Sequence, residues 1–391
     1  MLPTLLALSA CVGPTDSGGD GQPVDAGGGS TTTPSGGGGS GTLTVPDVDL
    51  DRLPQLRAAA LRDVRDWAYQ LQGTPALDLA PLARSAFDLF VIDYSADGSA
   101  AGEFTPQQIQ SLRESGPRPR IVLAYMSIGE AEVGRFYWND AWVTPNPGRD
   151  PDGPFTLTAA APDFLVEPNP DFPDNFKVRY WLDSWRRIIV ENPGGDPLIG
   201  DADSYLDRII AAGFDGVYLD IIDAFEFFGL EGTGERPQAA SEMIDFVAAI
   251  TRHARTVRGR TSFLVVPQNG AGIIAAAAFP AATVPAGVSA TDFAAQRRAD
   301  YFAAIDGIGA EDTFYFGDAD ENNPLDPQAA AIALLDGFRA AGLAVLAIDY
   351  VTRNELIDDF YGRAKARGWL PYASIRDLST LTVNPTQPPV D

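Results

Sequence analysis

The chain has 391 residues, of which 45% are hydrophobic, and its formal net charge at pH 7 is −25. So large an excess of acids disfavours nucleic acid and anionic membrane surfaces as partners and favours a neutral or cationic ligand. One cysteine and one histidine exclude an intrachain disulfide and a Cys/His zinc site. The histidine, His253, lies in an amphipathic helical pattern and is expected on a helix surface. Any catalysis is therefore expected to use carboxylates, with no cofactor and no metal.

The first eleven residues, MLPTLLALSAC, form a short apolar run that ends at Cys11. They resemble a bacterial lipoprotein signal peptide, in which cleavage before Cys11 leaves the thiol free for lipidation. Residues 12–41 are rich in Gly, Ser and Thr, which predicts a flexible linker. A lipid at Cys11 would tether the protein to the cell envelope, at the outer membrane or cell surface. An ordinary disordered N-terminus is the alternative.

Residues 42–391 are expected to form one domain in which short β-rich runs alternate with helical stretches. The runs are continuously apolar, which is typical of parallel strands covered on both faces. Eight such β/α repeats predict a TIM-type (β/α)8 barrel, with a doubly wound sheet as the alternative. The strands are expected at residues 66–71, 87–94, 120–129, 216–221, 262–270, 301–312, 343–350 and 370–375.

Sequence features also predict where helices begin and end. Thr105 and Pro106 precede apolar residues at helical spacing, which is typical of a capped helix start. Gly213 and Gly342 each follow a helical pattern and are expected to end a helix.

The connection after the third predicted strand is much longer than the others and is expected to be a large insertion. Long connections after a barrel strand lie at the catalytic mouth and are often functional. Trp181 and Trp185 are four residues apart, so they share one face if this segment is a helix. They would stack on a ligand or, alternatively, pack the core of the insertion. The segment holds four of the six tryptophans: Trp138, Trp142, Trp181 and Trp185.

Acidic and amide side chains lie at the C-terminal ends of six predicted strands, the edge at which TIM barrels carry their active sites. One such aspartate is often only a helix cap or a loop acceptor. Six strand ends together indicate a site, because burying so many carboxylates without a function is costly. These residues are Asp93 and Tyr94, Ser127, Gly129 and Glu130, Asp220 and Asp223, Gln268 and Asn269, Glu311 and Asp312, and Asp349 and Tyr350.

Carboxylates with amides and aromatic residues suit glycoside hydrolysis. That reaction needs one acid to protonate the leaving oxygen and a second carboxylate as nucleophile or as base for water. Crowding of carboxylates raises the pKa of one of them, which supplies the acid at neutral pH. Amides such as Asn269 can bind sugar hydroxyls, and tryptophan faces can stack on sugar rings.

Six segments, in order, also resemble the glycoside hydrolase family 114-like proteins, relatives of endo-α-1,4-polygalactosaminidase. They are FDLFVIDYSADG, IVLAYMSIGEAE, VRYWLDSWRRII, GFDGVYLDIIDAF, VVPQNG and DGIGAEDTFY. The resemblance covers roughly residues 62–378. Some members carry a cysteinyl-tRNA synthetase label, which a chain with a single histidine does not support. The resemblance implies a TIM-type barrel and two catalytic carboxylates, which match Asp220 and Glu311.

The resemblance suggests Asp220 as nucleophile or charge stabiliser and Glu311 as general acid/base, with the reverse assignment open and Asp223 as the main rival to Asp220. The implied function is a hydrolase of an extracellular polysaccharide, such as an α-1,4-linked galactosamine polymer. A non-catalytic carbohydrate-binding barrel and a hydrolase dependent on Mg²⁺ or Ca²⁺ are the alternatives. Residues expected to orient the sugar are Asp93, Tyr125, Glu130, Trp181, Asp223, Gln268, Asn269 and Asp349.

Overall fold

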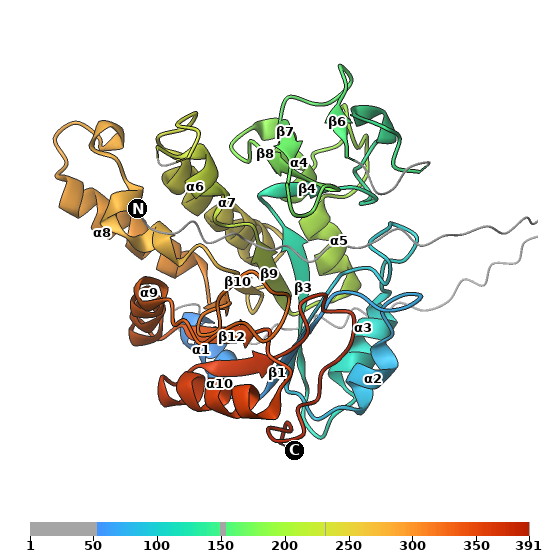
Figure 1. Cartoon of the computed structure of the whole chain (residues 1–391). Helices are drawn as coiled ribbons and strands as arrows, with labels where there is room; N and C mark the ends of the chain where they lie inside the picture. Colours follow the sequence, from blue (N-terminus) through green and yellow to red (C-terminus); the bar gives the residue numbers. More distant parts are fainter. Residues whose placement is uncertain (1–52, 149–153, 231, 391) are drawn as a thin grey trace, which may run out of the picture.

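The computed structural model describes residues 53–148, 154–230 and 232–390 (Figure 1). The predicted signal peptide with Cys11, the predicted linker at residues 12–41 and the first residues of the predicted domain lie outside the described part. No helix within that part is long and apolar enough to span a bilayer.

The centre of the fold consists of eight parallel strands in two sheets (Figure 1). One sheet has the order β1-β2-β3-β9-β10 and the other the order β11-β12-β13, and every adjacent pair is parallel. The first sheet comprises β1 (Trp67–Gln70), β2 (Leu89–Ile92), β3 (Ile121–Ser127), β9 (Gly216–Asp220) and β10 (Leu264–Pro267). The second comprises β11 (Gly307–Glu311), β12 (Ala344–Asp349) and β13 (Leu370–Ala373).

Two contacts join the edges of these sheets. A parallel bridge pairs Gln268, just after β10, with Gly309 in β11. At the other edge, the indole nitrogen of Trp67 in β1 donates to the carbonyl of Leu370 in β13 at 2.9 Å. All eight strands lie within the ranges predicted from the sequence, so the predicted mixed α/β fold with parallel strands is confirmed.

Helices connect the strands and cover their outer side (Figure 1). Two predicted helix signals are confirmed: Thr105 and Gln108 form a capping box at the start of α3, and Gly213, at φ 88°, ends α5. The helices are α1 (Leu53–Arg62), α2 (Leu79–Arg84), α3 (Pro106–Arg113), α5 (Tyr205–Ala212), α6 (Ala224–Phe228), α7 (Ala239–Arg252), α8 (Ala290–Ala304), α9 (Ala329–Ala340) and α10 (Asn354–Ala366).

The long connection between β3 and β9 carries its own secondary structure, at the upper right of Figure 1. Its largest part is an antiparallel sheet of order β4-β8-β7. Trp185 is fully buried and its indole donates to the carbonyl of Ile128 at 2.9 Å, so this tryptophan packs the core. The elements are β4 (Glu130–Glu132), η2 (Asp140–Trp142), β5 (Val143–Thr144), β6 (Thr156–Leu157), β7 (Leu165–Pro168), β8 (Asn175–Val178) and α4 (Asp183–Ile189).

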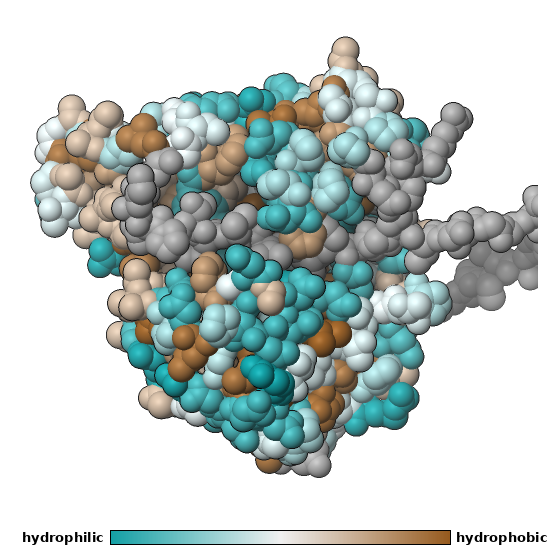
Figure 2. Space-filling model, viewed as in Figure 1, coloured by the Kyte–Doolittle hydropathy of each residue, from teal (hydrophilic) through white to brown (hydrophobic). Residues whose placement is uncertain are grey.

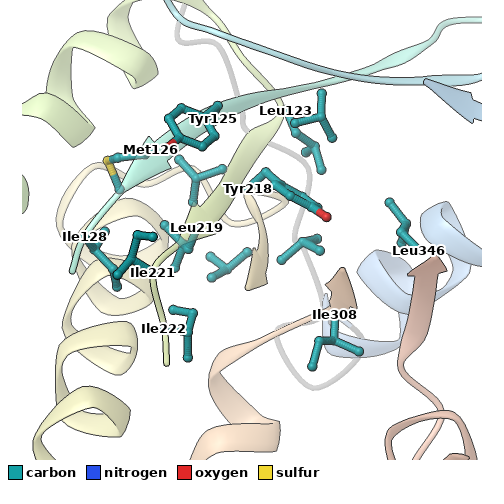
Figure 3. Close-up of a cluster of buried hydrophobic side chains, with 14 of the residues drawn as sticks. Leu123, Tyr125, Met126, Ile128, Tyr218, Leu219, Ile221, Ile222, Ile308 and Leu346 are labelled. Carbon is teal, nitrogen blue, oxygen red and sulfur yellow. The ribbon is translucent and has the colours of Figure 1, made fainter. Parts of the chain in front are cut away.

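Apolar side chains from strands of both sheets fill the interior (Figure 3). Tyr218 of β9 lies among them, and its ring centroid is 5.2 Å from that of Tyr69. Hydrophilic residues, with hydrophobic ones between them, cover the lower half of the surface in Figure 2.

Two sequence expectations were wrong. The sixth strand begins at Gly307 rather than at residue 301, because residues 301–304 form the last turn of α8, in which Tyr301 and Ala304 are buried. His253 is 2% exposed rather than on a surface, in a short π-helix (His253–Val257) that follows α7. Its Nε2 lies 2.8 Å from Oδ1 of Asp207, and this partner compensates for burying the imidazole.

Candidate active site

Asp220 ends β9 and is buried, with both carboxylate oxygens engaged. The hydroxyl of Tyr125 donates to Oδ2 at 2.9 Å, and the backbone N–H of Ile221 donates to Oδ1 at 2.9 Å. Tyr125 lies on the neighbouring strand β3, where it pairs with Tyr218, two residues before Asp220. Side chains two apart on a strand share a face, so the register places Tyr125 and Asp220 on the same side of the sheet. Hydrogen bonds of this kind stabilise an ionised carboxylate.

Glu311 ends β11 in an equivalent position. Asn269 holds it twice: its Nδ2 donates to Oε2 of Glu311 at 2.9 Å, and its Oδ1 accepts from the Glu311 backbone N–H at 3.0 Å. Asn269 has a φ of 58°, a backbone conformation that asparagine tolerates better than most residues. The hydroxyl of Tyr350 donates to Oε1. Burial, followed by the negative charge of Asp220, raises the pKa of Glu311 to about 7.

Two further carboxylates lie near Asp220. Burial and the charge of Asp220 raise the pKa of Glu130 to about 8, and Asn169 donates to Glu130 Oε1 at 3.1 Å. Asp223 precedes α6, and burial followed by the charges of Glu226 and Asp220 raises its pKa. We call Glu130, Asp220, Asp223 and Glu311 the acid cluster. Asp220 and Glu311 end the central strands β9 and β11, Asp223 follows β9, and Glu130 begins β4.

The two amide residues predicted for the site, Gln268 and Asn269, directly follow β10. Gln268 is buried, and its Oε1 accepts from the hydroxyl of Tyr69 at 3.1 Å. Asn269 is partly exposed beside Glu311. Of the predicted site residues, the structure thus brings together Tyr125, Glu130, Asp220, Asp223, Asn269 and Glu311. Gln268 directly precedes Asn269 in the chain.

Asp93 and Asp349, also predicted to orient the sugar, are both engaged by other groups of the protein. Asp93 is 1% exposed and forms an ion pair with Arg135, with Oδ2 at 2.7 Å from Nη1. Asp349 is fully buried, and its two oxygens accept from the three consecutive backbone N–H groups of residues 313–315 at 2.8–3.0 Å. It therefore shapes the loop after β11.

Trp181 belongs to an aromatic group of its own. Its ring packs edge-on against Phe228 of α6, with centroids 4.8 Å apart, and the guanidinium of Arg236 lies 5.3 Å from its centroid. The side chain is partly exposed.

Sequence reasoning did not assign roles to several residues that support the acid cluster. Tyr350 was among the residues predicted at the strand ends, but no feature of the sequence indicated that it contacts Glu311. Glu132 and Arg135 also remained unassigned: they form a buried ion pair at 2.8 Å, and Oε1 of Glu132 is 3.5 Å from the Tyr125 hydroxyl. In the part of the chain that the structure describes, no three His, Cys, Asp or Glu side chains are grouped so that they could hold a metal ion.

Comparisons with known proteins agree with this architecture. In a structural comparison, the glycoside hydrolase domain of PelA from Pseudomonas aeruginosa matches with a TM-score of 0.53 and 18% identity, covering 82% of this chain and 98% of that one. A protein of Thermotoga maritima, described as uncharacterized, is 32% identical over 82% of this chain and 83% of its own length. Another uncharacterized protein, from Methanocaldococcus jannaschii, is 33% identical over 80% of this chain and 75% of its own length. The family model of glycoside-hydrolase family GH114 matches residues 52–387, and the chain therefore belongs to this family.

Proposed function

We propose that this protein is a glycoside hydrolase that cleaves an extracellular polysaccharide with Asp220 and Glu311 as its two catalytic carboxylates. The main support is the difference between the surroundings of these two acids, each of which is the last residue of its strand. Asp220 accepts from Tyr125 and from a backbone amide, which favours its ionised form. Glu311 has a pKa raised to about 7, so much of it is protonated at neutral pH.

These surroundings favour one assignment of roles. Glu311 would act as general acid, giving its proton to the leaving glycosidic oxygen, and would then act as base. Asp220 would stabilise the positive charge that develops on the sugar ring, either as nucleophile or as an electrostatic partner. Burial and the charges of Glu226 and Asp220 raise the pKa of Asp223, which disfavours the ionised form that this role needs.

We infer further that the eight central strands close into a TIM-type barrel, with the β3–β9 connection as an insertion at its mouth. The bridge between Gln268 and Gly309 and the hydrogen bond from Trp67 to Leu370 support closure at the two junctions between the sheets. Closure would direct the ends of β3, β9, β10, β11 and β12 toward one opening, as a barrel active site requires.

A polymer of partly free galactosamine is the substrate class that we propose. Its ammonium groups would be attracted by the net charge of −25 and by the acid cluster. Salt at 0.1 M screens such attraction between charges that are more than about 10 Å apart, and acetylation removes the positive charge. Cleavage should therefore slow as salt or the degree of acetylation rises.

The direct test is release of reducing ends from partly deacetylated α-1,4-linked galactosaminogalactan by the protein and by Glu311→Gln. Glu355→Gln, at an exposed glutamate in α10, serves as the matched control. Cleavage by the parent and the control, but not by Glu311→Gln, is the expected result. Oligosaccharide binding without cleavage by all three proteins would instead support a carbohydrate-binding barrel. Equal rates with fully acetylated polymer would refute the proposed substrate class.

We also propose that a lipid on Cys11 holds the enzyme at the bacterial cell envelope. The apolar run before Cys11 and the Gly/Ser/Thr-rich segment after it support this location. Expression in a bacterial host with labelled palmitate should label the parent but not Cys11→Ser. Equal labelling of both proteins, or of neither, would contradict the proposal.

A further inference from the structure

Glu311 and Asp312 are neighbours at the end of β11, and two residues from other strands join them in a closed ring. Tyr350, directly after β12, donates to Oε1 of Glu311. Arg376, after β13, binds Asp312 with both terminal nitrogens, Nη1 to Oδ2 at 3.0 Å and Nη2 to Oδ1 at 2.8 Å. The ring closes because the Arg376 guanidinium carbon lies 4.1 Å from the centroid of the Tyr350 ring.

Several contacts hold this four-residue ring in place. Tyr350, Glu311 and Asp312 are each less than 10% exposed. The Nε of Arg376 donates to the carbonyl of Asp320 at 2.9 Å, so all three side-chain nitrogens of this arginine are used. Asp312 has a φ of 49°, a strained conformation for a residue with a side chain, which surrounding contacts must maintain. Three strand ends therefore jointly fix the position of one carboxylate.

We propose that Tyr350 and Arg376 are positioning residues for Glu311, with Tyr350 holding one carboxylate oxygen and Arg376 acting through the tyrosine. The inference rests on the proposed role of Glu311 as general acid/base. A cation over an aromatic ring interacts with its π-system, and next to a phenol it strengthens the hydroxyl as a donor. Asn269 holds the other oxygen through its amide nitrogen, which can only donate, whereas a tyrosine hydroxyl can donate or accept. Tyr350 can therefore remain bonded to Glu311 in both protonation states.

The hydrogen bond from Tyr350 opposes the rise in the pKa of Glu311 that burial and nearby charges cause. Burial and the charge of Asp220, with a contribution from Asp312, raise the pKa of Glu311, and the hydrogen bonds from Tyr350 and Asn269 lower it. The hydroxyls of Tyr69 and Tyr218 and the guanidinium of Arg376 also lie within electrostatic range of Glu311. Loss of the Tyr350 hydroxyl should thus move the titration of Glu311 further toward alkaline pH.

The test is a direct titration of Glu311 in the full chain, which needs no substrate. The protein is labelled with glutamate carrying ¹³C at Cδ, and the Glu311 signal is identified by its loss in Glu311→Gln. Titrations compare the parent with Tyr350→Phe, Arg376→Gln, Arg376→Lys and the double variant of Tyr350→Phe with Arg376→Gln. Tyr315→Phe is the matched control, because its hydroxyl donates to another carboxylate, Asp359, at 2.7 Å.

Tyr350→Phe should raise the titration midpoint of Glu311 by about half to one pH unit. Arg376→Gln should raise the midpoint by less than Tyr350→Phe does, and by a smaller amount still in the Tyr350→Phe background, where only the direct charge of the arginine remains to be lost. Arg376→Lys should restore part of the effect. The control variant, Tyr315→Phe, should leave the titration midpoint of Glu311 unchanged. Thermal unfolding of each variant identifies any that fails to fold, and the conservative changes Tyr350→Phe and Arg376→Lys keep the test valid in that case.

An unchanged midpoint in Tyr350→Phe would overturn the proposal. Equal shifts from Arg376→Gln in both backgrounds would also overturn it, because the arginine would then act by its charge alone. Failure of the proposed function looks different: the titrations would behave as expected while Glu311→Gln retained full cleavage. Where cleavage is measured, the alkaline limb of kcat/KM should move with the NMR midpoint, which a purely structural role would not produce.

Discussion

The hydroxyl of Tyr125 lies 2.9 Å from Oδ2 of Asp220 and joins β3 to the acid at the end of β9. In the proposed mechanism this bond stabilises the charged form of Asp220, and the same tyrosine ring has the guanidinium of Arg135 5.9 Å from its centroid. The two proposed catalytic carboxylates thus share one arrangement, since Tyr350 and Arg376 stand in the same relation to Glu311.

Replacing Tyr125 by Phe should therefore lower kcat/KM by about ten-fold, the loss expected for one hydrogen bond to a charged group. The fold should be kept, because only one hydroxyl is removed. Steady-state cleavage of the galactosamine polymer measures the effect, with Tyr315→Phe as control. An unchanged kcat/KM would show that this bond has no role in the reaction.

The pKa of Glu311, raised to about 7, predicts the alkaline limb of the pH profile. A general acid must be protonated, so kcat/KM should fall as the pH rises through about 7. The pH dependence of initial rates between pH 4 and 9 checks this prediction. A rate that keeps rising up to pH 9 would mean that Glu311 is not the general acid.

Glu130 should destabilise the fold at neutral and alkaline pH. Its pKa is about 8 in the folded state against an ordinary 4.5, so the folded state retains a proton that the unfolded state loses between these values. Stability attributable to this group is present below about pH 4.5 and is lost as the pH rises toward 8. Glu130→Gln should consequently be more stable than the parent at pH 8, by on the order of 1–3 kcal/mol.

Thermal unfolding at pH 5 and pH 8 tests this difference. The melting temperature of Glu130→Gln should exceed that of the parent by several degrees at pH 8 and by much less at pH 5. Glu355→Gln, at an exposed position, should show no such dependence. Equal differences at the two pH values would contradict the prediction.

Removing the charge of Arg135 should lower the free energy of unfolding strongly. It is 4% exposed and pairs with Asp93 at 2.7 Å and Glu132 at 2.8 Å, so Arg135→Met leaves two buried carboxylates without their cation. A loss of about 3–5 kcal/mol in the free energy of unfolding is expected. Arg118→Met, which removes an exposed partner of Asp88 at 3.2 Å, should cost less than about 1 kcal/mol. Similar losses in both variants, measured by chemical denaturation, would contradict this account.

The sequence was sufficient to predict the eight central strands, because parallel strands buried on both faces are continuously apolar and differ clearly from the helices between them. It misplaced the start of β11, since apolar residues 301–304 extend a helix face as readily as a strand. It misplaced His253 because a helical pattern does not reveal that Asp207, on another helix, compensates for burying an imidazole.

The site was only partly predictable for a related reason. The rule that sites lie at strand ends selected Asp220 and Glu311, and the structure shows that hydrogen-bond donors from neighbouring strands and strand ends bind both. The same rule selected Asp93 and Asp349, whose partners are Arg135 and the backbone amides of a loop. An acid that faces a ligand and an acid that holds a loop look alike in sequence, because only tertiary structure supplies the partner.

The central claim is that Asp220 and Glu311 carry out the cleavage. The most direct measurement compares kcat and oligosaccharide affinity for the parent, Asp220→Asn and Glu311→Gln, using a partly deacetylated galactosamine polymer and calorimetric binding of its oligomers. A fall in kcat of about a thousand-fold or more in both variants, with affinities within about ten-fold of the parent, is the predicted result. Retention of parental kcat by either variant, with its fold intact, would contradict the account.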